Sequence, residues 1–223
     1  MSFMIRILCL IIGYFIGCIQ TAYIVGRRKA NVDIRELGSG NAGTTNITRV
    51  FGLKTGLLVL FMDILKAVIA FLLCGAIFAF TGTDKLILGF YAGMGVVLGH
   101  NYPVFLKFKG GRGIASSMGV MLCVDWRMAL IIAAIGIFLI VMTRFVSLGS
   151  IVMLILFPIS ELLWHRGAES IVLAFILTAL ALFRHKGNIQ RLLNGTERKF
   201  DFAKKEIPAD DHSNEAGGDQ SGH

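Results

Sequence analysis

Residues 56–80 read GLLVLFMDILKAVIAFLLCGAIFAF, an apolar run in which Asp63 and Lys66 are the only charged residues. A helix needs about 20 apolar residues to cross the hydrocarbon core of a bilayer, so this run predicts a transmembrane helix. The two charges stand three residues apart and face the same way, and charges inside a membrane are costly unless they pair. We therefore expect an Asp63–Lys66 pair, either as part of a site or, as we favour, as a structural brace beneath a pocket.

The chain as a whole has the composition of an integral membrane protein. Of its 223 residues 55% are hydrophobic and 16% are charged, and the mean hydropathy is +0.72, whereas soluble domains carry about 25% charged residues. The formal net charge of +8 fits cytoplasmic loops that face anionic lipid, so we expect no nucleic-acid partner. The four cysteines lie inside apolar runs without paired or metal-type spacing, and we expect no metal.

Six further apolar segments bring the predicted number of spans to seven. They cover residues 7–25, 86–98, 113–124, 128–142, 150–164 and 170–183. Residues 113–124 are short for a span, and we expect a short helix there that begins in a basic cluster and is partly wrapped by protein. A removable signal peptide is the competing interpretation of residues 7–25, but Arg27-Arg28-Lys29 follows in place of a small-residue cleavage site and favours a retained span.

The predicted fold is thus an all-α integral membrane protein, a bundle of seven transmembrane helices in one domain over residues 1–203. The polar residues 204–223 are expected to form a disordered tail. Of the 22 Lys and Arg residues, 17 fall on one side of this topology and four on the other, with Lys66 inside a span. Positive charge gathers on the cytoplasmic side, so we expect the amino terminus outside and the carboxyl terminus and three polar clusters in the cytoplasm.

The first cluster reads GSGNAGTTNITR and covers residues 38–49. Its glycines allow positive φ angles, which turn backbone N–H groups toward one point and favour anion binding, and a helix start just beyond would add its dipole. Arg49 adds a permanent cation with a planar fork that suits phosphate. A plain glycine-rich turn between two spans is the alternative. The candidate binding residues are Gly38, Ser39, Gly40, Asn41, Gly43, Asn46 and Arg49.

The second cluster, residues 100–113, reads HNYPVFLKFKGGRG, where Pro103 is expected to stop the preceding span. Its end is again a glycine-and-cation arrangement that leads into a helix, although it lacks the pattern of a Walker loop. A basic loop lying on lipid phosphates is the alternative. The candidate residues are Lys109, Gly110, Gly111, Arg112 and Gly113.

The third cluster, residues 185–197, reads HKGNIQRLLNGTE. His185, Asn188 and Arg191 follow three-residue spacing and share a helix face, which favours a substrate-binding or proton-handling role over that of an ordinary surface histidine. Glu197 closes the cluster and is a candidate binding residue. Ser147 and Ser150 stand at the entry to the sixth span, where each either caps the helix or donates to a phosphate.

Together, GSGNAGTTNITR, GHNYPVFLKFKGGRGIA and HKGNIQRLLNGTE resemble the three signature motifs of the bacterial acyl-phosphate-dependent glycerol-3-phosphate acyltransferases. These are small seven-span membrane enzymes, and the resemblance extends to about Phe200. It implies transfer of a fatty acyl group from acyl phosphate to the 1-hydroxyl of sn-glycerol 3-phosphate, which gives lysophosphatidate and inorganic phosphate in phospholipid synthesis. The chain departs from the family at Arg112, where Lys is usual, and at Lys186-Gly187, where Arg-Glu is commoner.

We further expect a monomeric enzyme of the bacterial cytoplasmic membrane, and the distribution of Lys and Arg predicts that its active site faces the cytoplasm. Its partners would be glycerol 3-phosphate, acyl phosphate and membrane lipid, with no cofactor. Acyl phosphate is already activated, so we expect catalysis by positioning and charge stabilisation. The candidate catalytic residues are Arg49, Arg112, Ser150, His185 and Asn188.

Two other classes of function share some of these sequence features. A transporter or channel for an anionic metabolite would also place charges and broken helices in the membrane, but here the cationic loops gather on one predicted side and no internal repeat is visible. An alcohol phosphotransferase would need an aspartate-rich metal motif, which the sequence lacks.

Overall fold

The computed structural model describes residues 2–201, and within this range every regular element is a helix. The predicted tail at residues 204–223 lies outside the described residues. The α-helices are α1 (Ser2–Gly17), α2 (Thr21–Ala30), α3 (Thr44–Phe51), α4 (Leu53–Ile77), α5 (Lys85–Asn101), α6 (Ile114–Val124), α7 (Trp126–Thr143), α8 (Val146–Leu163), α9 (Ala168–Arg184) and α10 (Lys186–Leu193). Single 3₁₀ turns lie at Ile34–Glu36, Ala79–Thr81 and Val104–Leu106.

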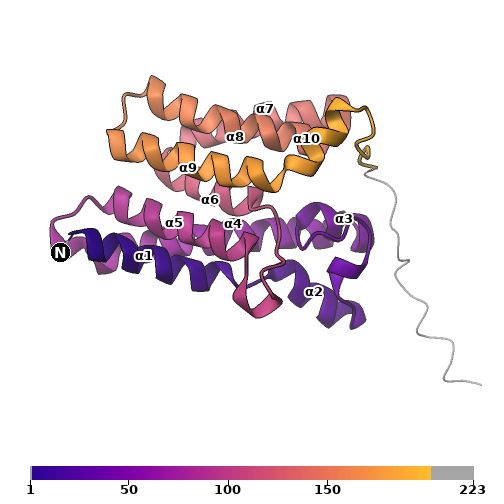
Figure 1. Ribbon diagram of the computed structural model, residues 1–223, viewed down its shortest axis with the longest axis horizontal. Helices are drawn as coiled ribbons and strands as arrows, with labels where there is room; N and C mark the ends of the chain where they lie inside the picture. Colours follow the sequence, from indigo (N-terminus) through magenta and orange to yellow (C-terminus); the bar gives the residue numbers. More distant parts are fainter. Residues whose placement is uncertain (1, 202–223) are drawn as a thin grey trace, which may run out of the picture.

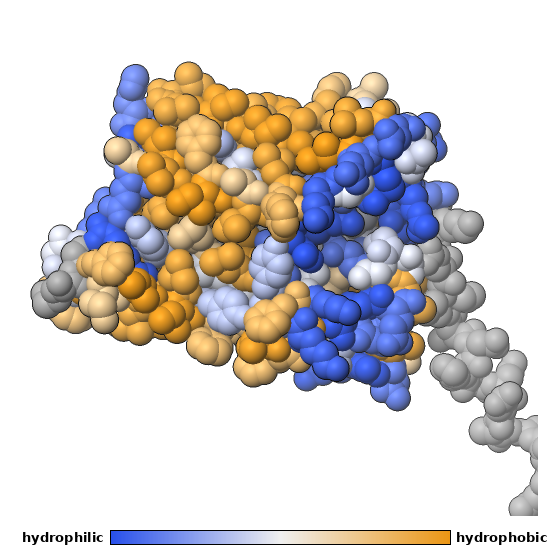
Figure 2. Space-filling view, viewed as in Figure 1, coloured by the Kyte–Doolittle hydropathy of each residue, from blue (hydrophilic) through white to orange (hydrophobic). Residues whose placement is uncertain are grey.

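The long helices run side by side along one direction, with α6 at the centre (Figure 1). Helix α6 packs against α4 and α5 on one side and against α7 and α8 on the other. Helices α2, α3 and α10 gather at one end, opposite the first residues of the chain (Figure 1). Hydrophobic residues dominate the middle of the visible face and hydrophilic residues its ends, above all the end that carries α2, α3 and α10 (Figure 2). We call that end the polar end.

Several helices are long and apolar enough to cross a membrane. In the described part of the chain they are Phe3–Ala30, which joins α1 and α2, together with α4, α7 and α8, and a fifth if α9 and α10, bent by 63°, count as one span. Helices α5 and α6 have only 17 and 11 residues. The all-helical membrane fold and the short helix at 114–124 are therefore confirmed. Seven spans and an external amino terminus remain predictions.

Glycines let α5 approach its neighbours closely. A Cβ atom added at Gly95 or Gly99 would collide with the backbone carbonyls of Leu10 and Tyr14 in α1. A Cβ at Gly93 would collide with the side chain of Val120 in α6. The backbones of α1 and α5 thus meet directly, which is the packing that small residues permit in membranes.

The first predicted span is interrupted, because α1 ends at Gly17 and α2 begins at Thr21. A break inside a membrane leaves carbonyl groups that need donors. Lys66 Nζ supplies one to the carbonyl of Ile19 at 2.9 Å, and it also pairs with Asp63 Oδ1 at 2.8 Å. Gln20 donates to the carbonyl of His100 at 3.1 Å. The expected charge pair is therefore confirmed, and its contacts are those of a brace at the break.

Candidate active site

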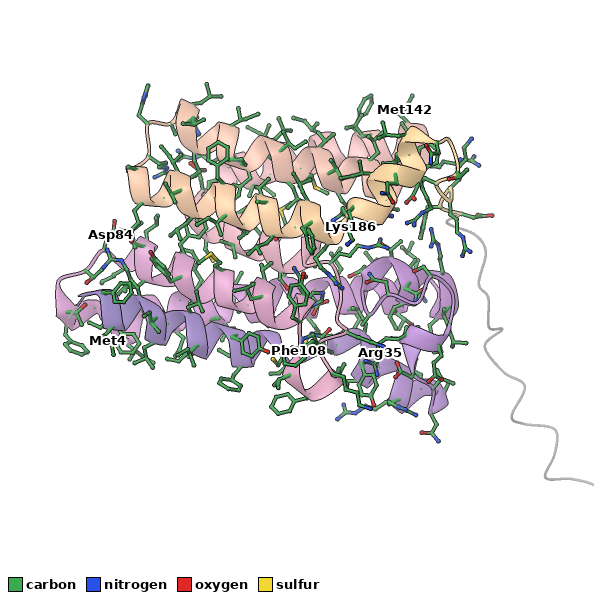
Figure 3. All side chains as sticks on the ribbon, in the orientation of Figure 1. Met4, Arg35, Asp84, Phe108, Met142 and Lys186 are labelled. Atoms are coloured by element: carbon green, nitrogen blue, oxygen red, sulfur yellow. The ribbon has the colours of Figure 1, made fainter. Side chains whose placement is uncertain are left out.

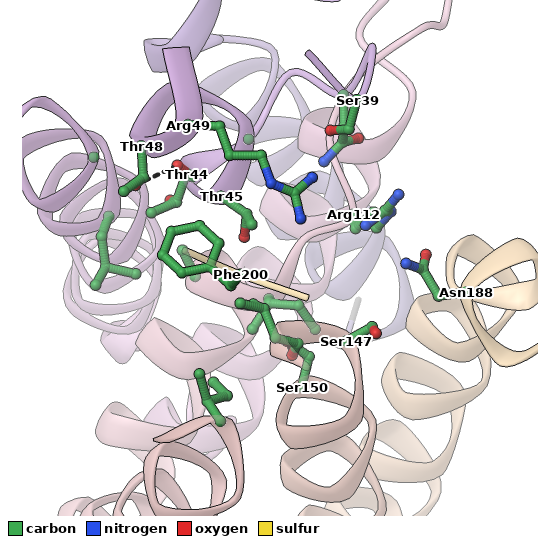
Figure 4. Close-up of a pocket in the computed structure, with 18 of the residues that line it drawn as sticks. Ser39, Thr44, Thr45, Thr48, Arg49, Arg112, Ser147, Ser150, Asn188 and Phe200 are labelled. Atoms are coloured by element: carbon green, nitrogen blue, oxygen red, sulfur yellow. Dashed lines mark hydrogen bonds between the residues drawn. The ribbon is translucent and has the colours of Figure 1, made fainter. Parts of the chain in front are cut away.

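A cavity of about 710 Å³ opens at the polar end, and all three polar clusters line it. This volume is typical of a ligand-binding site. Figure 4 shows Ser39 and Arg49 from the first cluster, Arg112 from the second and Asn188 from the third pointing toward one another. The expectation that segments far apart in sequence share one cavity is thus confirmed.

The first cluster is shaped by the buried side chain of Asn46. Its Oδ1 accepts from the backbone N–H of Ser39 at 2.7 Å, and its Nδ2 donates to the carbonyls of Ile34 and Leu37 at 2.9 and 3.0 Å. Helix α3 then begins at Thr44, so its first-turn N–H groups lie at the cavity wall with Thr44 and Thr45. The Asn46 side chain therefore fixes the conformation of this loop through hydrogen bonds to its backbone, and it faces away from the cavity.

A second helix, α6, begins at the cavity, directly after the second cluster. Gly113 caps α6 with a φ of 78°, a left-handed conformation that glycine adopts without a steric penalty. Ile114 and Ala115, the first residues of α6, line the cavity beside Arg112. Two helix amino termini with their positive dipole ends thus border the same space, an arrangement that favours anions.

The third cluster is organised by the Glu197 carboxylate. Its Oε1 accepts from Ser147 Oγ at 2.7 Å and from Asn188 Nδ2 at 2.6 Å, while Oε2 accepts from Arg191 Nε at 2.8 Å. Burial alone would raise the pKa of Glu197, but hydrogen bonds from these three residues outweigh it and lower the pKa below its ordinary value. Glu197 is therefore ionised at neutral pH and fixes Ser147 and Asn188 at the cavity wall.

His185 lies at the break between α9 and α10, with its ring buried against the cavity. Its Nδ1 is 2.8 Å from the carbonyl of Ala181, and a carbonyl oxygen only accepts, so Nδ1 carries the proton. Burial lowers the pKa of His185 to about 4, against the upward effect of that hydrogen bond. The ring is therefore neutral at pH 7, and Nε2 is left as an acceptor.

The electrostatics of the cavity favour a bound anion. Burial lowers the pKa of the Arg112 guanidinium, and the charge of Arg191 lowers it further. Arg184 and Arg49 act in the same direction, while Glu197 opposes them. An arginine that stays protonated among other cations is stabilised when a phosphate enters.

The cavity brings together most of the candidate residues but not all. Those that line it are Gly38, Ser39, Asn41, Gly43, Arg49, Arg112, Gly113, Ser150, His185, Asn188 and Glu197. Gly40, Asn46, Lys109, Gly110 and Gly111 are absent from its lining. Lys109 is exposed, and the other four shape the loops. Gly38 and Gly40 have the expected positive φ angles, whereas Gly43 is extended.

Neither serine at the start of α8 caps that helix. Ser147 donates to Glu197, and Ser150 Oγ donates to the carbonyl of Val146 at 2.9 Å. Both line the cavity. The sequence alone left their roles open, and the structure rules out the capping role for both.

Other lining residues were missed from the sequence. Phe200 lies beside Arg49, with the guanidinium carbon 5.8 Å from the ring centre (Figure 4). An apolar limb of the cavity extends along α4 and α7. Its lining includes Leu57, Leu60, Ile64, Ala133, Ile137 and Ile140. Their spacing of three or four residues is a signal for one helix face, but it does not tell a cavity wall from a packed interface.

The described residues thus define a class of protein, a multi-pass integral membrane protein with a cationic cavity at one end of its bundle. In this part of the chain no three His, Cys, Asp or Glu side chains lie close enough together to hold a metal ion.

Comparison with known proteins places the chain within that class. Residues 7–195 match the family model for glycerol-3-phosphate acyltransferase. The chain is 46% identical to the glycerol-3-phosphate acyltransferase of Thermoanaerobacter sp. (strain X514), over 88% of this chain and 96% of that one. It is 43% identical to the enzyme of that name from Clostridioides difficile (strain 630), over 89% and 97%.

Solved structures agree. The crystal structure of PlsY (YgiH), an integral membrane glycerol 3-phosphate acyltransferase, in its glycerol 3-phosphate form matches with a TM-score of 0.80 and 36% identity. Its lysophosphatidic acid form matches with a TM-score of 0.78, and each comparison covers 88% of this chain and 96% of the other. The chain belongs to the glycerol-3-phosphate acyltransferase family and is an acyltransferase of phospholipid synthesis.

Proposed function

We propose that the acyl donor is acyl phosphate and that the acceptor is the 1-hydroxyl of sn-glycerol 3-phosphate. The observation that carries this proposal is the shape of the cavity, in which a cationic end lined by Arg49 and Arg112 continues into an apolar limb between α4 and α7. Acyl phosphate has the same two parts, an anionic head and an apolar chain. Glycerol 3-phosphate brings a second phosphate, which fits a site with two helix amino termini and several arginines.

In the proposed reaction the glycerol oxygen attacks the acyl carbon, and the bond from that carbon to the phosphate oxygen breaks. An ester forms, inorganic phosphate leaves, and the hydroxyl proton ends on the departing phosphate. Arg49, Arg112 and the first-turn N–H groups of α3 and α6 stabilise the charge on both phosphates. His185 Nε2 and Asn188 orient the attacking hydroxyl. Ser150 borders the same space, and Gly38, Ser39, Asn41 and Gly43 bring backbone toward the phosphates.

We also propose that the enzyme is a monomer in the bacterial cytoplasmic membrane, with seven spans and the polar end facing the cytoplasm. One chain supplies all three polar clusters that line the cavity, which supports a monomer. The distribution of Lys and Arg supports the orientation with the polar end in the cytoplasm. Acyl phosphate is activated, so the proposed reaction needs no cofactor.

The test is an assay of purified protein with glycerol 3-phosphate and either palmitoyl phosphate or palmitoyl-coenzyme A. Lysophosphatidate and inorganic phosphate should appear in equal amounts with palmitoyl phosphate, and neither should form with the coenzyme A ester. Turnover of only the coenzyme A ester would overturn the proposed donor. Uptake of labelled glycerol 3-phosphate into sealed vesicles without any acyl donor would instead support a transporter.

A further inference from the structure

We propose that Arg184 is a positioning residue that holds residues 109–113, the phosphate loop, in the shape that presents Arg112 to the cavity. This inference rests on the function proposed above for Arg112. Arg184 is the last residue of α9 and directly precedes His185. It is absent from the cavity lining, so it acts on the reaction indirectly, either through the residues it holds or through its charge.

The guanidinium of Arg184 donates hydrogen bonds to two consecutive carbonyl groups of the phosphate loop. Its Nη2 donates to the carbonyls of Gly110 and Gly111 at 3.2 and 3.0 Å, and its Nε donates to the carbonyl of Gly111 at 3.2 Å. The guanidinium carbon also lies 5.0 Å from the ring centre of Tyr102. A rigid planar fork that makes these contacts fixes the plane of the peptide group it binds.

The other side of the loop is held by the end of α5. The backbone N–H of Gly110 donates to the carbonyl of Asn101 at 3.3 Å, and that of Gly111 donates to the carbonyl of His100 at 3.0 Å. A Cβ at Gly111 would collide with the His100 ring and crowd the carbonyl of Ala42 in the first cluster. Gly110 and Gly111 are thus fixed through their N–H groups by α5 and through their carbonyls by Arg184.

These contacts set the position of the residues that follow. Arg112 comes directly after Gly111, and Gly113 caps α6. Because His185 is bonded directly to Arg184, the end of α9 that presents His185 also anchors the phosphate loop. Arg184 therefore fixes the position of Arg112 relative to His185, and a misplacement of about 1 Å in such a site can reduce the rate about 100-fold.

A general electrostatic effect is the competing explanation, because Arg184 is one of the cations whose charge acts on Arg112. Substitution by lysine separates the two. Lys keeps the positive charge but is a point donor and cannot bridge two carbonyls in a fixed plane. If geometry matters, Arg184→Lys stays impaired; if charge alone matters, it has normal activity.

The experiment uses the full-length enzyme in detergent and compares Arg184→Gln and Arg184→Lys with a control and a reference. Lys186→Gln is the matched control, because Lys186 (labelled in Figure 3) is an exposed cation at the start of α10 that is absent from the cavity lining. Its Nζ lies 4.8 Å from the ring centre of Phe183. Arg112→Gln is the reference for the site itself. The kcat and KM for each substrate are measured from release of inorganic phosphate, together with the thermal unfolding midpoint.

Both Arg184 variants should lose about 10- to 100-fold in kcat/KM, mainly through a higher KM, with an unchanged unfolding midpoint. Lys186→Gln should stay within about twofold of the parent enzyme. Normal kinetics in Arg184→Lys, or a loss in both variants that follows the folded fraction with KM unchanged, would overturn the inference. If Arg112→Gln is impaired while both Arg184 variants are normal, this inference alone fails. If Arg112→Gln is normal too, the proposed function of the site fails with it.

Discussion

Substitution of Glu197 by glutamine isolates the contact that organises the third cluster. The amide oxygen of the new side chain can still accept from Ser147 and Asn188, which both donate to Oε1. The amide nitrogen, in contrast, replaces Oε2. In the parent protein Oε2 accepts from Arg191 Nε at 2.8 Å, and an amide nitrogen cannot accept this hydrogen bond. The variant therefore loses one charge-assisted hydrogen bond and weakens two others.

The magnitude follows from those three contacts. A hydrogen bond to a charged group contributes about 1.5–3 kcal/mol, and a neutral one roughly half of that. The Arg191 side chain is 44% exposed, so its share is reduced by solvent screening. The sum is about 2–4 kcal/mol. If this free energy is lost from the contacts that position Asn188 in the transition state, kcat/KM falls about 30- to 1,000-fold.

The assay is release of inorganic phosphate by purified enzyme, normalised to folded protein. Glu36→Gln is the matched control, because it removes an exposed carboxylate of the 3₁₀ turn Ile34–Glu36 that is absent from the cavity lining. Glu36→Gln should behave like the parent enzyme. A kcat/KM within about threefold of the parent for Glu197→Gln would refute the positioning role of the carboxylate.

Three further outcomes are expected. Lys66→Met leaves Asp63 as a buried charge without its ion-pair partner and should lower the free energy of unfolding in detergent by about 3–5 kcal/mol. The double variant Lys66→Met/Asp63→Asn should be destabilised less than Lys66→Met alone. A larger destabilisation in the double variant would contradict the role of the pair as a brace. The pKa of His185 is lowered to about 4 from 6.5, so its contribution to stability is complete above pH 6.5 and is lost as the pH falls toward 4, about 3 kcal/mol in all. In His185→Gln the unfolding midpoint should depend less on pH between pH 6.5 and 4 than in the parent enzyme. An unchanged pH dependence would contradict the lowered pKa of His185. Ala133→Phe fills the apolar limb on α7 and should reduce kcat/KM for palmitoyl phosphate more than for decanoyl phosphate, whereas the exposed neighbour Ala134→Phe should change neither.

The helices and the three polar clusters were predictable because each is a local property of the chain. Apolar runs bounded by charges determine where helices lie in a membrane, and Pro103 ends α5 within two residues. The short helix at 114–124 followed from its length alone. The pairing of Asp63 with Lys66 followed from their spacing and from the cost of an isolated charge in lipid.

The interruption of the first span was not predictable from residues 7–25, because the break at residues 18–20 holds a single polar side chain, that of Gln20, within an apolar run. It depends on a donor from α4, the Lys66 ammonium, which binds the carbonyl of Ile19, together with the Gln20 amide inside the break, which binds the carbonyl of Gly17. Tertiary contacts of this kind override local propensity.

The split of the candidate residues between cavity and scaffold was also beyond sequence reasoning. Lys109 and Arg112 belong to one motif, yet Lys107 and Phe108 adopt positive φ angles and Lys109 ends exposed, whereas Arg112 reaches the cavity. Asn46 looked like a ligand because its amide can bind phosphate, but its oxygen accepts from Ser39 and its nitrogen donates to two carbonyls. The alternation of inward and outward side chains in such loops is set by backbone turns that composition does not encode.

The central claim is that three segments distant in sequence grip two phosphorylated substrates in one cavity. The most direct measurement is a crystal structure with glycerol 3-phosphate and palmitoyl phosphonate, an analogue whose head group cannot leave. Both phosphorus groups should lie between Arg49 and Arg112, with the alkyl chain between α4 and α7. A phosphonate bound outside this cavity, or two head groups held at opposite ends of the bundle, would contradict the account.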